Sequence, residues 1–573
     1  MKKNFFLLFL IGYSALLSQN PSFVWAKRIL NVGSFKPDAG HDIATDAHNN
    51  VYVTGQFTDT LYVANDTLMA PVAMAEDVFV MKAKSDGTPL WAIPFSSANS
   101  DNSTQIRVSP SGDRIFVAGK MAGSPATFGN SFSGVITKTY SGWGDFVACL
   151  DTSGHLLWVN MIASANGGYA PAITLDANAN IYMAGCFYDN TSISFMATNG
   201  NFTSPQSGNF SGMYLIKMDV SGNLQQHIVE KAGSGFYPYY APYGMDYSAA
   251  ANSIYITGYF FDSCYVGSTV AARSYGQTDI FLSSYSTSLT PNWLRSFGGN
   301  DLASVSDCGM DVSADAEGNA ILIGIFVDTC IFGSTTLTDA TSGNGEGFIA
   351  EINASGNPVW AKQFHNPSPY STFLLDVEVG RDASIYMSGA MHMPGKYVNT
   401  NLTGSNTNNF DFFVMKTDSL GNFGWFESGG GGFNDYGYGM CISGNNDIYI
   451  TGGLGETSSW MFDTIQGFAA NGAGNYYDIC YAKLNDPQVT IGMNEWNPLA
   501  ETVSVFPNPS NGNFKMETDF PARIIISDLQ GRCVYDAQTW NGEICIEGIA
   551  DGCYVLTAIA GEHVSQAKIV VKR

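Results

Sequence analysis

Charged residues are scarce in this sequence, and basic residues are the scarcest. Charged residues make up 13% of the 573 residues, about half of the usual ~25%. Lys and Arg number 26 against 50 Asp and Glu, which leaves a formal net charge of −24 at pH 7. Nucleic acid repels a chain of this sign, so we exclude it as a partner. Because 45% of the residues are hydrophobic, the chain is not a disordered acidic segment either.

Cysteine and the common catalytic motifs are also lacking. The ten cysteines form no C-x-x-C pair, which excludes a scaffold built on disulfides and gives no support to a zinc or dithiol site. We expect most of them to be small core residues and leave one or two disulfides open. P-loop, H-E-x-x-H, G-x-S-x-G and EF-hand spacings are absent, so we predict no catalytic residue, no metal and no cofactor. A carboxylate pair assembled from distant parts of the chain remains the enzymatic alternative.

One acidic and histidine-containing group has residue types that could bind a metal ion. It contains His41, Asp42, Asp46 and His48. Asp46 and His48 fall on a turn that recurs along the chain, where Asp and Asn are ordinary turn residues. We therefore interpret them as turn residues rather than metal ligands.

Long hydrophobic runs are missing except at the N-terminus. Lys2 and Lys3 precede an apolar run over 5–17, which is too short for a membrane span and is followed by small residues. This pattern predicts a signal peptide over residues 1–18, with cleavage near Ser18.

An internal repeat dominates the rest of the chain. An aromatic residue heads an extended run at intervals of 65 to 68 residues, with Gln226 in one slot. The aromatic positions are Trp25, Trp91, Trp158, Trp293, Trp360 and Trp425. A second marker, a glycine that ends an apolar strand, keeps the same period at Gly55, Gly119, Gly185, Gly258, Gly324, Gly389 and Gly452. A regular period of this length indicates a repeat architecture.

Each repeat contains four strand candidates joined by polar turns that contain Gly or Asn. A four-stranded antiparallel sheet repeated seven times predicts an all-β fold, a seven-bladed β-propeller over residues 19–486. The alternative is a string of small sandwich domains, but no linker interrupts the period. In each repeat, the strand that carries the repeated aromatic follows the hairpin before it. The run Phe23 to Leu30 carries Trp25 and has no hairpin before it, whereas the last hairpin, Asp478 to Asn485, is not followed by such a strand. We therefore predict that the N-terminal strand completes the last sheet, which hides an exposed edge.

The repeat resembles a known family. Its elements W-A-K-x-F, G-G-x-x-x-D, D-x-x-x-N-x-Y-V-T-G and D-x-F-V-x-K look like the seven-bladed β-propeller repeat of secreted bacterial proteins. The resemblance covers about residues 23–485. It implies a fold and no particular chemistry, because the family is defined by its repeat.

The period stops after Asp486. A linker over 487–503 leads to alternating apolar residues and turn glycines over 504–573, which predict a small β-sandwich. This module resembles the type A C-terminal sorting domain of type IX secretion, with matching residues Pro507, Asn508, Pro509, Gly512, Gly531, Gly552 and Lys568. The resemblance implies the type IX machinery as a partner, export through the periplasm and outer membrane, and release or attachment at the cell surface. A generic immunoglobulin-like binding module is the alternative.

Tyrosines on the long connections give the candidate ligand site. Consecutive strands run antiparallel, so the connections alternate between the two faces of the ring of sheets. The connections from the second to the third strand and from the fourth strand to the next sheet lie on the same face of the ring. That face carries the ligand candidates Tyr169, Tyr239, Tyr240, Tyr243 and Tyr436, with Tyr370 and Tyr438 at comparable places. Such rings stack on sugars or hold a peptide, and the alternative is that they pack as a lid over the ring.

These observations predict a secreted or cell-surface monomer that binds a glycan or a protein without catalysis. The alternatives are a secreted hydrolytic enzyme acting on glycans, built on the same scaffold, and a purely structural surface component.

Overall fold

The computed structural model describes the chain in two units, Met1–Val489 and Thr490–Arg573. In the first unit it describes residues 21–32, 38–72, 74–164, 171–187, 193–196, 202–204, 211–232, 240–266, 270–299, 307–339, 345–366, 371–404, 409–455, 459–462, 465–468 and 477–486. In the second unit it describes residues 504–506, 513–517, 522–528, 533–539, 542–545, 550, 552–560 and 563–572. The predicted signal peptide, 1–18, and linker, 487–503, lie outside these residues.

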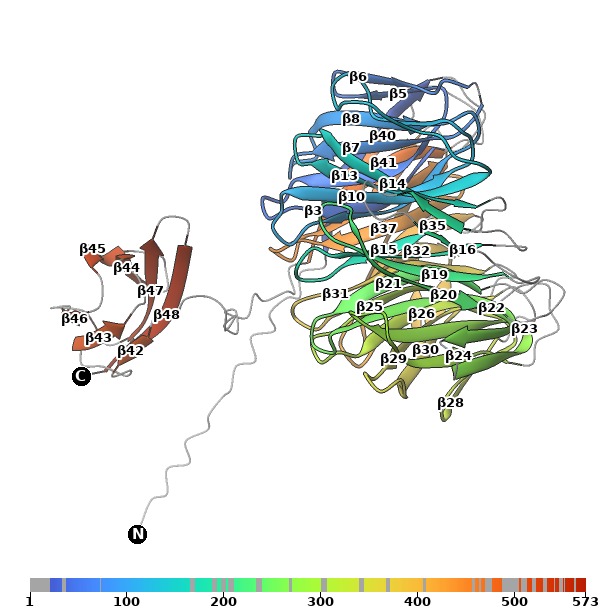
Figure 1. The fold of residues 1–573 in the computed structure, drawn as a ribbon. Helices are drawn as coiled ribbons and strands as arrows, with labels where there is room; N and C mark the ends of the chain where they lie inside the picture. The colour runs from blue at the N-terminus through green and yellow to red at the C-terminus, as the bar shows by residue number, and fades with distance from the viewer. Residues whose placement is uncertain are drawn as a thin grey trace, which may run out of the picture. The chain divides into compact units, whose positions relative to one another are not determined.

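The described part of the chain is all-β. In the first unit, seven antiparallel arrays of four strands follow one another along the chain (Figure 1). Their strands, from first to fourth, are as follows. The first sheet has β3 (Ala39–Thr45), β4 (Val51–Phe57), β7 (Asp77–Ala83) and β8 (Pro89–Ser96), and the second has β9 (Asn102–Val108), β10 (Arg114–Met121), β13 (Trp143–Asp151) and β14 (Leu156–Ser164). The third has β15 (Ala172–Leu175), β16 (Ile181–Phe187), β19 (Gly212–Met218) and β20 (Leu224–Lys231), and the fourth has β21 (Tyr240–Ser248), β22 (Ser253–Val266), β23 (Val270–Ser286) and β24 (Pro291–Phe297).

The remaining sheets keep the same order. The fifth has β25 (Cys308–Ala314), β26 (Ala320–Phe326), β29 (Glu346–Ile352) and β30 (Pro358–His365), and the sixth has β31 (Thr372–Val379), β32 (Ile385–His392), β35 (Phe410–Thr417) and β36 (Phe423–Gly430). The seventh has β37 (Asp435–Ile442), β38 (Ile448–Gly455), β41 (Tyr477–Asn485) and, as its fourth strand, β1 (Ser22–Arg28).

The connections between second and third strands form short hairpins, which lie at the outer edges of the sheets. Four of them extend the fourth strand of the preceding sheet, namely β11 (Ala126–Phe128) with β12 (Ile136–Lys138), β17 (Ile193–Met196) with β18 (Phe202–Ser204), β33 (Gly395–Tyr397) with β34 (Thr400–Leu402), and β39 (Ser459–Phe462) with β40 (Ile465–Phe468). The hairpin of β5 (Thr60–Val63) and β6 (Asp66–Met69) pairs with β2 (Leu30–Val32), while β27 (Thr329–Phe332) and β28 (Thr335–Thr338) pair only with each other. These hairpins protect sheet edges.

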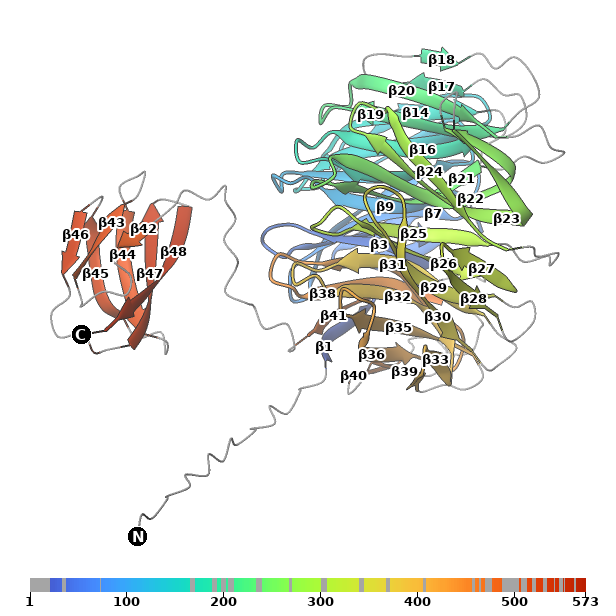
Figure 2. The same cartoon turned by 90° about the horizontal axis from the view of Figure 1, so that it is seen from below.

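The first strands of the seven sheets contact one another in sequence. β3 contacts β9, and the contacts continue through β15, β21, β25 and β31 to β37, which contacts β3 again. The blue and orange ends of the first unit are therefore adjacent, as both Figure 1 and Figure 2 show. The cores lie between successive sheets and are built from the alternating apolar residues of both.

The N-terminal strand completes the last sheet, as predicted from the extra strand at the N-terminus and the strand missing after the last hairpin. β1 pairs antiparallel with β41, in a register that places Ser22 opposite Asn485 and Arg28 opposite Cys480 (Figure 2). The Arg28 guanidinium forms an ion pair with Asp478 at the start of β41. The predicted closure of this sheet is confirmed.

The repeated tryptophans explain why glycine occurs in the tight turns between the third and fourth strands. The Trp158 indole is buried against the turn of the next sheet, and its Nε1 donates a hydrogen bond to the Val220 carbonyl at 3.2 Å. Gly222 in that turn has a φ of 78°, and a Cβ there would lie 2.8 Å from the indole. The same Trp–Gly contact occurs for Trp25, Trp91, Trp293 and Trp360 with Gly87, Gly154, Gly356 and Gly421. Where Gln226 replaces the tryptophan, the facing turn position holds Leu289 instead of glycine, at a φ of 54°.

The second unit contains two antiparallel sheets. One has β42 (Ser504–Phe506), β43 (Asn513–Glu517) and β46 (Gly542–Cys545), and the other has β45 (Cys533–Thr539), β44 (Ala522–Asp528), β47 (Gly552–Ala560) and β48 (His563–Val571). Gly552 begins β47, and Lys568 lies in β48 opposite Val555. The other predicted sorting residues, Pro507, Asn508, Pro509, Gly512 and Gly531, lie outside the described residues.

Candidate functional site

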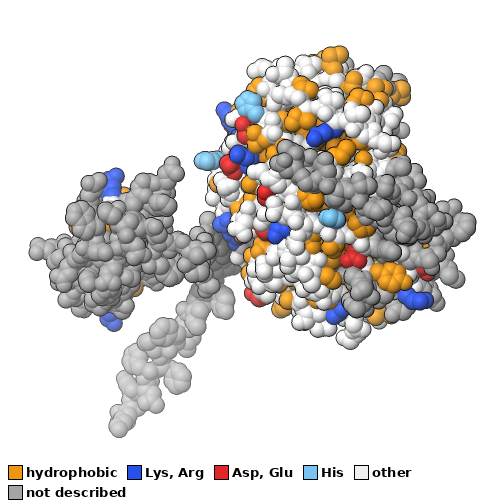
Figure 3. Space-filling model, viewed as in Figure 1, with side chains coloured by type: hydrophobic (Ala, Val, Ile, Leu, Met, Phe, Trp, Pro, Cys, Tyr) orange, Lys and Arg blue, Asp and Glu red, His pale blue; other side chains and the backbone are white. Residues whose placement is uncertain are grey.

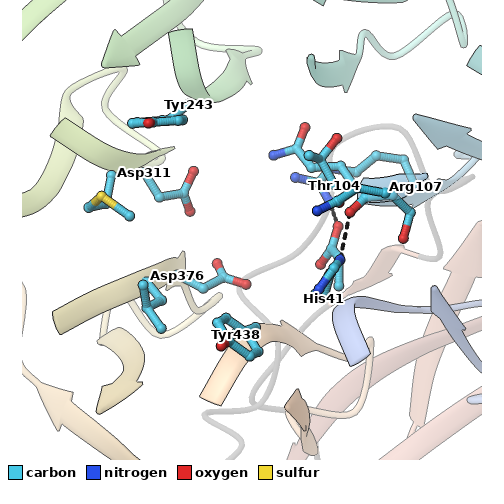
Figure 4. A pocket seen from close by; sticks show the side chains of 13 residues that line it. His41, Thr104, Arg107, Tyr243, Asp311, Asp376 and Tyr438 are labelled. Carbon is cyan, nitrogen blue, oxygen red and sulfur yellow. Dashed lines mark hydrogen bonds and ion pairs between the residues drawn. The ribbon is translucent and has the colours of Figure 1, made fainter. Parts of the chain in front are cut away.

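A cavity of about 260 Å³ lies between the first strands of the sheets of the first unit. Six different sheets supply its walls, through β3, β9, β21, β25, β31 and β37 (Figure 4). The lining residues are His41, Asp42, Asn102, Ser103, Thr104, Gln105, Arg107, Tyr243, Met310, Asp311, Leu375, Asp376 and Tyr438. Residues far apart in the sequence meet here because equivalent strand positions of successive repeats lie side by side.

Several acidic side chains of the cavity connect one sheet to the next. Asp42 Oδ2 accepts hydrogen bonds from the Ile106 backbone N–H at 2.8 Å and from Arg107 Nη1 at 2.6 Å. Asp376 Oδ2 accepts from the Met440 N–H at 2.6 Å in the same way. Each of these carboxyl groups therefore has a structural role, because it satisfies a backbone donor of the neighbouring first strand.

Asp311 and Asp376 form a carboxyl pair. Asp311 Oδ2 accepts from the Val377 N–H at 3.1 Å, and its carboxyl group also hydrogen-bonds that of Asp376. Burial raises the pKa of Asp311 to about 7, and burial together with the charge of Asp311 raises the pKa of Asp376 well above its usual range. Two buried carboxyl groups in contact share a proton for this reason.

Arg107 supplies the positive charge of the cavity. Burial opposes its charged form, but Asp42, Glu378 and Asp376 outweigh that effect and raise the pKa of Arg107. In Figure 4 Arg107 and His41 lie on one side, and Asp311, Asp376 and Tyr243 face them across the open space. The cavity thus presents a guanidinium and carboxyl groups at opposite walls.

His41 and the two tyrosines add aromatic surface. His41 Nδ1 lies 2.7 Å from the Ser103 carbonyl oxygen, and burial lowers the pKa of this imidazole, so the ring is neutral at pH 7. The Tyr438 ring meets His41 edge to face, with centroids 5.7 Å apart. The Tyr243 ring lies 5.7 Å from that of Tyr259. All three cavity rings, those of His41, Tyr243 and Tyr438, are only partly buried.

The predicted ligand tyrosines have different positions. Tyr243 lines the cavity, and Tyr436 lies beside the cavity residue Tyr438, with parallel rings 5.6 Å apart. Tyr240 is a wrong candidate because it is fully buried, with its ring 4.7 Å from that of Phe281. Tyr169 and Tyr239, and also Tyr370, lie outside the described residues.

The hydrogen bonds of the Asp46 turn settle the role of that residue. Asp46 Oδ1 accepts the backbone N–H groups of His48 and Asn50, each at 2.9 Å, which confirms its predicted role in the turn. Among the described residues, no group of three or more His, Cys, Asp or Glu side chains is arranged to hold a metal ion. The cysteines of the first unit, Cys149, Cys186, Cys264, Cys308, Cys330, Cys441 and Cys480, are free thiols.

Arg107, Asp311 and Asp376 are the site residues that the sequence did not indicate. Asp311 and Asp376 occupy the first-strand position that Asp42 occupies in the first sheet, and Arg107 occupies the position of Asp246 and Glu378. Polar and charged residues recur at these two positions of the first strands, and this recurrence is the signal that identifies them.

The visible surface of the first unit carries few charges. Figure 3 shows Lys, Arg, Asp and Glu side chains scattered among uncharged atoms, with no single charged patch. No helix in the described part of the chain is long and apolar enough to cross a membrane.

The second unit is an export signal by its similarity to known domains. Residues 504–572 match the family described as the secretion system C-terminal sorting domain. This domain directs export through type IX secretion, so the protein reaches the cell surface or the extracellular space.

Matches to the rest of the chain are distant. An uncharacterized WD repeat-containing protein of Acanthamoeba polyphaga mimivirus is 22% identical over 217 residues, which are 34% of this chain and 15% of that protein. A solved structure of a Dyadobacter fermentans protein of unknown function is 10% identical, with a TM-score of 0.39, and covers 82% of this chain and 99% of its own. A polysaccharide lyase structure, also 10% identical, has a TM-score of 0.38 and covers 80% of this chain and 92% of its own. Likenesses this low carry no argument about function.

Proposed function

We propose that the first unit is a seven-bladed β-propeller that works outside the cell as a carbohydrate-binding module, and that its axial cavity is the binding site. The cyclic contacts of the seven first strands and the completion of the last sheet by β1 support the propeller. The sorting domain accounts for delivery, followed by release or attachment at the outer-membrane surface.

The observation that carries this proposal is the meeting of aromatic and charged groups in one cavity. Tyr243 and Tyr438 offer partly exposed rings, while Arg107 and the Asp311 carboxyl offer hydrogen-bond donors and acceptors. Sugars need both kinds of contact, because their C–H faces pack on aromatic rings and their hydroxyl groups bond to charged and polar groups. The volume of about 260 Å³ is just under the ≈300–1,000 Å³ of ordinary ligand pockets, which suits one sugar residue.

An enzyme acting on glycans is the second candidate, and the Asp311–Asp376 pair is the observation that favours it. Glycosidases, however, keep their two carboxyl groups about 5–9.5 Å apart to leave room for the sugar or water. Asp311 and Asp376 hydrogen-bond each other and also hold backbone N–H groups of the next sheets. The pair is better suited to joining sheets than to acid–base catalysis.

The test is a panel of neutral and acidic mono- and oligosaccharides, assayed by calorimetry for binding and by reducing-end release for turnover. We expect binding without turnover, and loss of binding in Tyr243→Ala and Tyr438→Ala variants of unchanged melting temperature. Phe423→Ala is the matched control, because Phe423 is an exposed ring at the tight-turn end of β36. Turnover by the wild type would favour the enzyme, and binding to a protein but to no sugar would refute the carbohydrate site.

A further inference from the structure

A continuous row of aromatic rings leads from the sixth sheet to the axial cavity. It consists of Phe373 at the start of β31, Phe410 at the start of β35, and Tyr436 and Tyr438 in β37; we call these four residues the aromatic track. Successive ring centroids lie 5.4 Å, 5.8 Å and 5.6 Å apart. The track ends at the cavity, where Tyr438 contacts His41 of the first sheet.

The track lies at one end of the sheets. In these antiparallel sheets the first and third strands run in the same direction, so the starts of β31, β35 and β37 lie at the same end. This is the end with the long connections. Tyr477, at the start of β41, adds a ring 5.9 Å from Tyr436.

Packing of the sheets does not require aromatic residues at these positions. The positions equivalent to Phe373 and Tyr436 in other sheets hold Ala39, Asn102, Ala241 and Cys308. The positions equivalent to Phe410 and Tyr477 hold Glu76, Trp143, Ser211, Thr278 and Gly345. The fold therefore tolerates small or polar residues at both places. The second sheet has an aromatic residue at one of them, Trp143, whereas the sixth and seventh sheets carry aromatic residues at both.

The rings of the track are supported from one side and remain partly accessible. All four are partly buried, and none is among the fully buried side chains of the core. His392 is 3% exposed and meets Phe410 edge to face at 4.2 Å, and burial lowers its pKa, so the support is uncharged at pH 7. A row of fixed, accessible rings is a stacking surface for flat apolar faces.

We infer that the ligand is a neutral oligosaccharide chain, with one sugar residue in the cavity and the following residues along the aromatic track. This inference rests on the proposed function of the cavity. The spacing between successive rings is close to the length of one pyranose in a chain, so successive sugars meet successive rings. A neutral chain is favoured because the net charge of −24 and the acidic walls of the cavity repel uronic acid polymers.

The experiment compares chain lengths on the full mature protein. The probes are gluco-oligosaccharides of one to six units with β-1,4 or α-1,4 linkage, together with oligogalacturonates as acidic probes, all measured by calorimetry. We expect affinity for a neutral series to rise at least 10-fold from monosaccharide to tetrasaccharide. Phe410→Ala and Tyr436→Ala should each weaken tetrasaccharide binding about 2- to 10-fold, as expected for one aromatic contact. Monosaccharide binding should not change in these variants.

Controls separate stacking from damage to the fold. Tyr436→Phe should keep chain binding, and Phe423→Ala, at the opposite end of the sixth sheet, should have no effect. Tyr243→Ala should weaken short and long probes alike. Binding that is independent of chain length, or preference for oligogalacturonate, would overturn this inference and leave the cavity as a sugar site. Failure of every probe to bind would overturn both.

Discussion

The contact between a marker tryptophan and the next turn glycine allows a quantitative test of how the sheets are joined. Gly222 has a φ of 78°, and an added Cβ would meet the Trp158 ring at 2.8 Å. The left-handed backbone alone makes alanine cost about 1–2 kcal/mol there. Overpacking against the indole adds about 1–3 kcal/mol. We expect Gly222→Ala to lower the free energy of unfolding by about 2–5 kcal/mol in total.

The two contributions separate in a double-mutant cycle. In a Trp158→Ala background the clash with the indole is gone and the Asn160 Nδ2 contact at 3.0 Å remains, so Gly222→Ala should then cost little more than the backbone share of about 1–2 kcal/mol. Gly112→Ala is the matched control, because Gly112 has a φ of 71° and nothing within 4 Å of its added Cβ. Urea unfolding followed by near-UV circular dichroism measures all four variants. An equal cost of Gly222→Ala in both backgrounds would refute the clash.

Three further predictions concern pH, export and the last sheet. Burial, together with Asp101, raises the pKa of Asp77 to about 8, and burial raises that of Asp101 to about 7. Both folded-state pKa values exceed that of an unfolded aspartate, so the stabilisation of the fold by the protonated carboxyl groups is complete below about pH 4 and is lost as the pH rises through about 7 to 8. The urea concentration at the midpoint of unfolding should fall over this range, and Asp77→Asn should make that fall smaller. A chain ending at Asp486 should fold and stay in the periplasm, which fractionation and immunoblotting would show; its normal appearance at the surface would contradict the sorting role of residues 504–572. Trp25→Ala should cost less than the about 3–5 kcal/mol of a fully buried tryptophan, because Trp25 is only partly buried, and a larger loss of unfolding free energy would contradict that estimate.

The periodicity of the sequence predicts the strands and their order, because the same physical requirements recur in each repeat. The glycines of the tight turns are required by the facing tryptophans, and the exception at Leu289 coincides with Gln226. The pairing of β1 with β41 follows from counting strands, since an unpaired edge would be exposed otherwise.

The site was predicted less completely than the strands. Tyr240 and Tyr243 belong to one aromatic run, and the sequence does not reveal which of them faces the sheet interior. The structure pairs Tyr240 with Phe260 and places a bulge between Pro242 and Gly244. Residues three apart in a strand point to opposite faces, so Tyr240 enters the core while Tyr243, which lies at the bulge, lines the cavity. Residues such as Arg107 and Asp376 come together only through the arrangement of distant strands, which no local pattern encodes.

The pairing of β1 with β41 also bears on the order in which the chain folds. β1 is synthesised first, and it lacks its pairing strand until β41, at the other end of the same unit, has been made. Within the described part of the first unit, the pairing of β1 with β41 joins the strands that are farthest apart in the sequence. Forming this pairing therefore carries the largest loop-entropy cost. Completion of the seventh sheet therefore waits until nearly the whole first unit has been made, and the chain that follows contains the sorting domain. A folded first unit therefore belongs to a chain that has been completed almost to its sorting domain.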